Sequence, residues 1–172
     1  MLALLPGALV LQDEQVLVRC EPLVEEVRCA AEAVLPVPVD AVLRLVEDPG
    51  SYAETYPTIA ATEQQPDGTY RVDVRLPWPM PSWPLTVTAT SADAGPWKGV
   101  HLTDIGGGVG VWHDAEIRVR PDERGSVVQW AWSGPAIYPG WARPRIHRTF
   151  GHNAVWALAQ AVGAEPEAPR VE

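Results

Sequence analysis

Histidine is the residue type in this chain best suited to proton transfer near neutral pH, because its usual pKa is about 6.5. The sequence contains four histidines, His101, His113, His147 and His152. If the hairpin around Gly107 is symmetric, His101 and His113 lie opposite each other. An inward-facing histidine beside an apolar cavity could then act as general base on an enolisable substrate. The alternative is a structural histidine, and two histidines without a third ligand do not indicate a zinc site.

Tyrosine hydroxyls would assist such chemistry as hydrogen-bond donors, and Tyr56 and Tyr70 are the candidates. The sequence shows no nucleophile, base and orienting group at a recognisable spacing. A binding site is therefore favoured over covalent catalysis.

Tryptophan is unusually frequent, since the chain has eight tryptophans and one phenylalanine. Trp130 and Trp132 are two residues apart, so in a strand they project to one face, where they either stack on a flat ligand or fill the core. Trp78 and Trp83 belong to a proline-rich segment, 77–84, that cannot be a regular central strand. This segment forms either a bulged strand edge or a gate over the mouth of a cavity.

Net charge and glycine spacing exclude several classes of function. A formal net charge of −9, without a Lys/Arg run, opposes nucleic acid and anionic membranes as partners. The glycine cluster at 106–110 lacks the Lys-Ser/Thr of a phosphate-binding loop and precedes a strand pattern, so we interpret it as a turn. The apolar run over 1–11 is too short to span a bilayer and has no basic flank, so we expect no signal peptide and no membrane insertion.

The chain has two cysteines, Cys20 and Cys29. Their spacing resembles neither a metal site nor a disulfide framework, although the two could in principle pair. We expect two reduced thiols in a cytoplasmic protein.

The hydrophobic pattern predicts an α+β domain. Residues 27–35 have the composition of a strand, and apolar residues at 39, 42, 43 and 46 predict an amphipathic helix, followed by a short second helix that ends at Pro57. From Tyr70 the pattern alternates with period two, which is typical of an antiparallel meander with one buried face. Helical periodicity returns from Pro144 to Ala161, with Gly163 as the stop.

The last helix carries a stripe of mostly small residues, Ala154, Ala157, Leu158 and Ala161. Small side chains that face a sheet either allow close contact or leave space for a ligand. We expect a cavity on the order of a few hundred Å³ between the sheet and this helix.

This order of elements resembles the helix-grip fold of the START-like (SRPBCC) superfamily, which includes polyketide cyclases, lipid-transfer domains and birch-pollen-allergen relatives. Residues 33–42, 48–52 and 56–57 are similar to the family's first strand and helix pair. Residues 76–79 resemble the Pro-Trp-Pro stretch of START-type domains, and 134–141 resemble the loop before the final helix. The Arg-Asp pair that often follows the Pro-Trp-Pro stretch is replaced here by Met80-Pro81-Ser82-Trp83.

The resemblance implies a curved antiparallel sheet of about six to seven strands wrapped around a long C-terminal helix, with two short helices after the first strand. The resemblance covers a START-like ligand-binding domain (27–163). We interpret 1–26 as an N-terminal extension packed on this domain and, from its content of Glu and Pro, 164–172 as a disordered tail.

The function that this fold implies is binding or transport of a small hydrophobic ligand, such as a lipid, an isoprenoid or a polyketide-like molecule, without a cofactor. One alternative is a cyclase or aromatase-type enzyme that uses the same cavity with His113 or His101 as acid/base. A second is an interaction module whose cavity has collapsed. The residues expected to face the ligand are Tyr70, Val72, Val74, Trp78, Trp83, Val87, His113, Ile117, Trp130, Trp132, Phe150, Ala154, Ala157 and Ala161.

Overall fold

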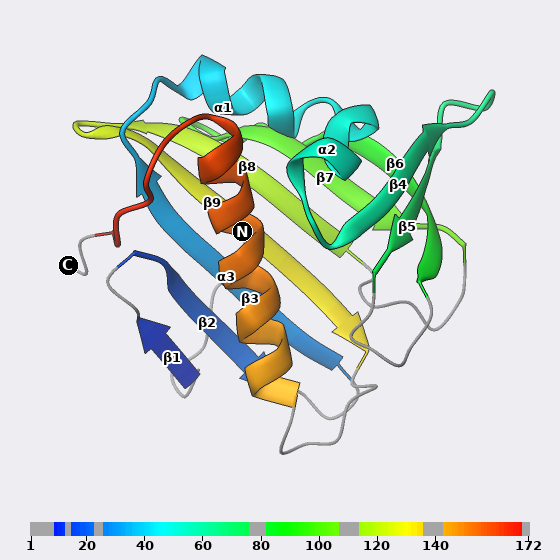
Figure 1. Ribbon diagram of the computed structural model, residues 1–172, viewed down its shortest axis with the longest axis horizontal. Helices are drawn as coiled ribbons and strands as arrows, with labels where there is room; N and C mark the ends of the chain where they lie inside the picture. The colour runs from blue at the N-terminus through cyan, green and yellow to red at the C-terminus, as the bar shows by residue number, and fades with distance from the viewer. Residues whose placement is uncertain are drawn as a thin grey trace.

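The computed structural model describes residues 9–12, 15–22, 26–75, 82–106, 114–135 and 143–169 (Figure 1). Its strands are β1 (Leu9–Gln12), β2 (Leu17–Pro22), β3 (Glu26–Leu35), β4 (Ile59–Gln64), β5 (Tyr70–Val74), β6 (Trp83–Ser91), β7 (Lys98–Asp104), β8 (Asp114–Asp122) and β9 (Gly125–Pro135). Its helices are α1 (Val39–Val46), the 3-10 helix η1 (Pro49–Ser51), α2 (Tyr52–Thr55) and α3 (Arg143–Ala161).

The described strands form one antiparallel sheet of nine strands in the order β1-β2-β3-β9-β8-β7-β6-β5-β4. Neighbouring strands are consecutive in sequence except for β3 and β9, whose pairing joins the two ends of the chain. α3 lies across β2, β3 and β9, whereas α1 packs on β7 and β8 (Figure 1). The predicted α+β helix-grip arrangement is confirmed, with nine strands in place of six or seven.

Period-two alternation produces the buried face of the sheet. Val72 and Val74 on β5 are buried, as are Ile117 and Val119 on β8, while the residues between them on β5 point to the other face. Burying such a side chain contributes about 1.5–3 kcal/mol. Because a slip of one residue would turn these side chains outward, the burial pattern also determines the strand register.

The additional strands lie at the two edges of the sheet. β1 and β2 form a hairpin that pairs with β3, so the described part of the segment predicted as an N-terminal extension continues the sheet. At the opposite edge, Ile59 is the only fully buried residue of β4. An edge strand with so little buried surface has no apolar alternation by which the sequence could reveal it.

α3 ends where the sequence predicts. Gly163 has a φ of +69°, a left-handed conformation that glycine adopts without strain. Its N–H donates to the Gln160 carbonyl (3.0 Å) and the Ala164 N–H donates to the Ala159 carbonyl (2.9 Å), which together make a Schellman motif. No helix within the described residues is long and apolar enough to cross a membrane.

The segment after α3 returns to the sheet, whereas residues 164–172 were predicted to be a disordered tail. The Glu167 carbonyl accepts a hydrogen bond from the Val34 N–H (2.7 Å), and the Glu167 N–H donates to the Val34 carbonyl (2.8 Å). Pro166 and Pro169 are buried. Residues 164–169 thus occupy the edge of β3 just beyond the point where its pairing with β2 ends.

Cys20 and Cys29 form a disulfide, so the expectation of two reduced thiols is wrong. The two residues are directly opposite each other on β2 and β3, and both are buried. Their spacing in sequence did not reveal this, because the pairing depends on the register of a strand whose existence had not been predicted.

Removing the disulfide with the double substitution Cys20→Ala/Cys29→Ala is expected to lower the free energy of unfolding by about 2–3 kcal/mol, since the bond closes a short loop in the unfolded chain. The measurement is urea denaturation of the variant beside wild type with and without reductant. Wild type with reductant should resemble the variant. Two thiols titrating in denatured, unreduced wild type would contradict the assignment.

Candidate functional site

A small apolar cavity lies between the sheet and the helices that cover it. Its lining comes from η1, α2 and the turn that follows, β4 to β7, β9 and α3. The residues that line it are Pro49, Tyr52, Thr58, Ile59, Val72, Val74, Val87, Leu102, Trp130 and Phe150. None of these residues is charged.

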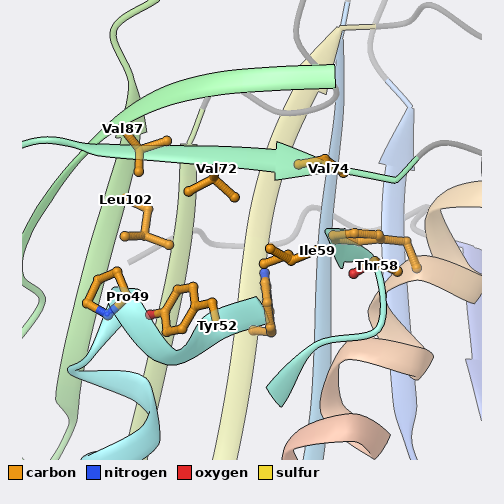
Figure 2. A pocket seen from close by; sticks show the side chains of 10 residues that line it. Pro49, Tyr52, Thr58, Ile59, Val72, Val74, Val87 and Leu102 are labelled. Atoms are coloured by element: carbon orange, nitrogen blue, oxygen red, sulfur yellow. The ribbon is translucent and has the colours of Figure 1, made fainter. Parts of the chain in front are cut away.

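The sheet side of this cavity follows from the strand pattern. Val72 and Val74 on β5, Val87 on β6 and Leu102 on β7 all belong to the buried face. Figure 2 shows the three valines on one side of the space and Pro49 and Tyr52 on the other.

The segment opposite the sheet is held by its own hydrogen bonds. Asp48 accepts the Gly50 N–H at 3.1 Å and thereby caps η1. Ser51 does not cap α2, because its hydroxyl donates to the Asp48 carbonyl (2.9 Å). The Tyr52 hydroxyl donates to the Val46 carbonyl at 2.5 Å, which ties α2 to the end of α1.

Aromatic rings connect α2, the sheet and α3. Tyr52 contacts Tyr56 edge to face with ring centroids 5.2 Å apart, and Tyr56 contacts Trp130 in the same way at 4.8 Å. Phe150 of α3 contacts Trp130 at 6.1 Å and Trp132 at 5.6 Å. Each such pair adds about 0.5–1.5 kcal/mol beyond its buried area, so the chain of rings helps to hold α2 and α3 against the sheet.

Burial dominates the acid–base properties of the two tyrosines. It raises the pKa of the Tyr52 hydroxyl well above its usual value, with smaller contributions from Tyr56, Asp48 and Tyr70, and it also raises the pKa of the Tyr56 hydroxyl. Both hydroxyls are protonated throughout the physiological range. They can act as hydrogen-bond donors, but not as bases.

The cavity measures about 20 Å³, far below the few hundred Å³ expected from the sequence. Known small-molecule sites occupy about 300–1,000 Å³. The difference arises because Trp130, Tyr52 and Phe150 project into the space between the sheet and the helices.

Half of the cavity lining was among the residues expected to face a ligand, namely Val72, Val74, Val87, Trp130 and Phe150. Tyr70 and Trp83 are partly buried and pack against the core without lining the cavity, and Ile117 and Trp132 are buried elsewhere on the same face. Trp78 and His113 lie outside the described residues.

The small-residue stripe of α3 makes close contact with the sheet. Ala154 and Ala157 are buried but do not line the cavity, and Ala161 is exposed, so its expected inward orientation is wrong. The contact is tight at Gly151, where an added Cβ would lie 2.2 Å from a ring carbon of Trp132. Of the two roles considered for the small residues, the structure favours close packing.

His101 lies on the opposite face of the sheet from the cavity, because its neighbours Val100 and Leu102 are the buried residues of β7. Its side chain is about half exposed, and its Nε2 lies 3.1 Å from Asp114 Oδ1. The strand register places His101 opposite Glu116, so the symmetric hairpin that would pair it with His113 is not formed.

Sequence reasoning missed Pro49, Tyr52, Thr58, Ile59 and Leu102 as cavity residues. A signal existed for two of them: Pro49 and Tyr52 lie in a segment, 48–52, that resembles the helix pair of the START-like fold. Thr58 and Ile59 follow a turn, and no periodicity predicts which way a side chain points there.

Comparison with solved structures identifies the class of fold. The chain is similar to a StAR-related lipid transfer protein from Xanthomonas axonopodis, with 18% identity, a TM-score of 0.72 and coverage of 91% of this chain and 98% of that one. Human StAR-related lipid transfer protein 5 is 10% identical, with a TM-score of 0.73, and the match covers 91% of this chain and 86% of that one. The di-domain ARO/CYC protein StfQ of the steffimycin biosynthetic pathway is 12% identical, with a TM-score of 0.54. The match covers 80% of this chain and 49% of the StfQ chain.

The resemblance to START-like proteins expected from the sequence is thus confirmed at the level of the fold. No protein-family model and no curated protein matches the sequence. At these identities the comparisons establish the helix-grip fold, and the function has to be argued from the site.

Proposed function

We propose that this protein binds a small hydrophobic molecule between the inner face of the sheet and the helices α2 and α3. The observation that carries the proposal is the cavity itself, which is lined by apolar side chains from both layers. Its position between an antiparallel sheet and a C-terminal helix, in a fold shared with proteins named for lipid transfer, supports the same function.

Binding requires the cavity to open, because about 20 Å³ accommodates no more than a water molecule. The element best placed to move is α2, which has only four residues and covers one side of the cavity. In this proposal a ligand displaces α2 and the adjoining turn from the sheet, and the ring contacts between Tyr56 and Trp130 are re-formed around it.

A carrier is favoured over the enzymatic alternative by the polar groups at hand. Among the described residues that line the cavity, Thr58, Tyr52 and Trp130 carry a polar group, and none of these is a general base; the Tyr52 hydroxyl is already bonded to a carbonyl. His113 remains the predicted acid/base of the alternative, and a turnover assay on enolisable substrates with His113→Ala tests it.

Filling the cavity tests the carrier proposal directly. Val87→Phe places a ring inside it, whereas Thr88→Phe places the same ring on the opposite face of β6. With the neutral fluorescent probe N-phenyl-1-naphthylamine, we expect wild type and Thr88→Phe to bind and Val87→Phe to lose at least about tenfold in affinity, as a blocked pocket should. Circular dichroism checks that each variant folds.

Native mass spectrometry of the purified protein, followed by solvent extraction, identifies any co-purified molecule. If the spectrum shows the bare chain and the probe does not bind to wild type, the carrier proposal fails. The interaction module with a collapsed cavity then becomes the better hypothesis.

A further inference from the structure

Two polar groups beside the cavity are buried without a hydrogen-bond partner among the described residues. These are the indole Nε1–H of Trp130 and the hydroxyl of Tyr56. Both residues are more than nine-tenths buried, with exposures of 4% and 1%. A buried donor without an acceptor is destabilising, and most such donors in proteins are satisfied.

Packing alone does not require these groups. A phenylalanine would supply the ring contacts at position 56 without a hydroxyl, and the nearby Tyr52 hydroxyl does have an acceptor, the Val46 carbonyl. Trp130 differs from Tyr56 in one respect, because its side chain lines the cavity and that of Tyr56 does not. Of the two residues, Trp130 is therefore the one whose side chain a bound molecule contacts.

The lining also restricts the charge of that molecule. None of the described residues that line the cavity is charged. A carboxylate or phosphate would lose its hydration without gaining a cationic partner, which is strongly unfavourable. A neutral molecule with an apolar body meets no such cost.

We propose that the ligand is a neutral hydrophobic molecule bearing a carbonyl or hydroxyl oxygen, and that this oxygen accepts a hydrogen bond from Trp130 Nε1. This inference rests on the proposed binding function and adds the chemical class of the ligand and the residue that selects it. The selection operates through a penalty, because a pure hydrocarbon in the same place leaves the indole N–H unpaired.

The test uses three probes with one bicyclic skeleton: 1-indanone, indane and indane-1-carboxylate. We expect the preference for indanone over indane to be about tenfold greater in wild type than in Trp130→Phe, the size expected of one hydrogen bond. Taking the ratio of the two affinities within each variant removes the effect of the smaller phenylalanine ring. Indane-1-carboxylate should bind most weakly to wild type.

Tyr56→Phe is the matched control, since it removes an equally buried, unpartnered hydroxyl from a residue whose ring contacts Trp130 but which does not line the cavity. It should keep the wild-type preference. An independent measurement compares the two probes in wild type itself. In ¹H–¹⁵N spectra, the Trp130 indole resonance, assigned by its loss in Trp130→Phe, should shift downfield with indanone and not with indane.

The outcomes separate the two proposals. If indane and indanone bind but the preference is the same in wild type and Trp130→Phe, or the Trp130 resonance does not distinguish the two probes, binding stands and the donor assignment is overturned. A preference lost in Tyr56→Phe alone would transfer the role to Tyr56. If no probe binds at all, both proposals fail.

Discussion

Replacing Gly151 by leucine is expected to lower the free energy of unfolding by about 3 kcal/mol or more, at the upper end of what overpacking costs. An ideal Cβ at this position would lie 2.2 Å from Trp132 Cη2, 2.8 Å from Cζ3 and 3.1 Å from the Ala31 Cβ. The Trp132 ring cannot easily withdraw, since it is buried against Phe150 and its Nε1 donates to His147 Nδ1 at 3.3 Å. Glycine is a poor helix former, so its presence within α3 is best explained by this contact.

Ala161→Leu is the matched control, because it adds the same side chain to the same helix at an exposed position. Its effect should stay within about 0.5 kcal/mol of wild type. Both free energies are measured by urea denaturation. Equal stability of the two leucine variants would show that α3 does not approach the sheet as closely as described, and would reopen the possibility of a larger cavity beside it.

Deleting residues 164–172 is expected to cost about 3–5 kcal/mol, contrary to the neutral effect that a disordered tail would predict. The deletion removes two backbone hydrogen bonds to Val34, worth about 1 kcal/mol each, and the burial of Pro166 and Pro169. The ion pair between Arg124 and Glu167 (3.3 Å) adds little, since Glu167 is more than half exposed.

Deleting only residues 170–172 provides the control, because it retains every contact described for 164–169. This shorter deletion should leave the thermal midpoint unchanged. If both deletions behave alike, the pairing between Glu167 and Val34 contributes nothing measurable to stability.

Elements with a strong local pattern were predictable from the sequence. α1 has three buried residues at helical spacing, Val42, Leu43 and Val46, and it spans the expected residues. The strands β5 and β6 alternate in burial over their central residues, and the inward residues of β8 and β9 also recur at every second position, so these faces followed from period two. The end of α3 was signalled by Gly163, the residue type that its left-handed conformation favours.

Elements that depend on distant partners were not predictable. β7 shows only Val100 and Leu102 as a buried pair, after a buried Gly99 that makes room for the backbone of β8. The tail gives no strand pattern. It pairs with β3 at Val34 because the pairing between β2 and β3 extends only as far as Glu32. Such contacts are determined by where other strands stop, and one sequence does not show that.

The residues that line the cavity were predictable mainly where they lie on the strands of the sheet. The alternation placed Val72, Val74, Val87 and Trp130 on the cavity side. The volume of the cavity depends instead on rotamers of a few large rings, which periodicity does not determine. His101 shows the same limit, because the hairpin register that carries it away from His113 depends on a turn whose length had to be assumed.

The pairing of β3 with β9 bears on how the chain folds. These two strands lie roughly 100 residues apart in sequence, whereas every other described pair of strands is contiguous, so one contact accounts for much of the contact order of the domain. The hairpins from β4 to β9 can form from local interactions as the chain emerges from the ribosome. The strands β1 to β3 can likewise pair locally, but one edge of β3 must wait for β9, and its other edge at Val34 must wait for residue 167. Joining the two parts of the sheet is therefore a late step, and until then β3 presents an unpaired edge to other chains.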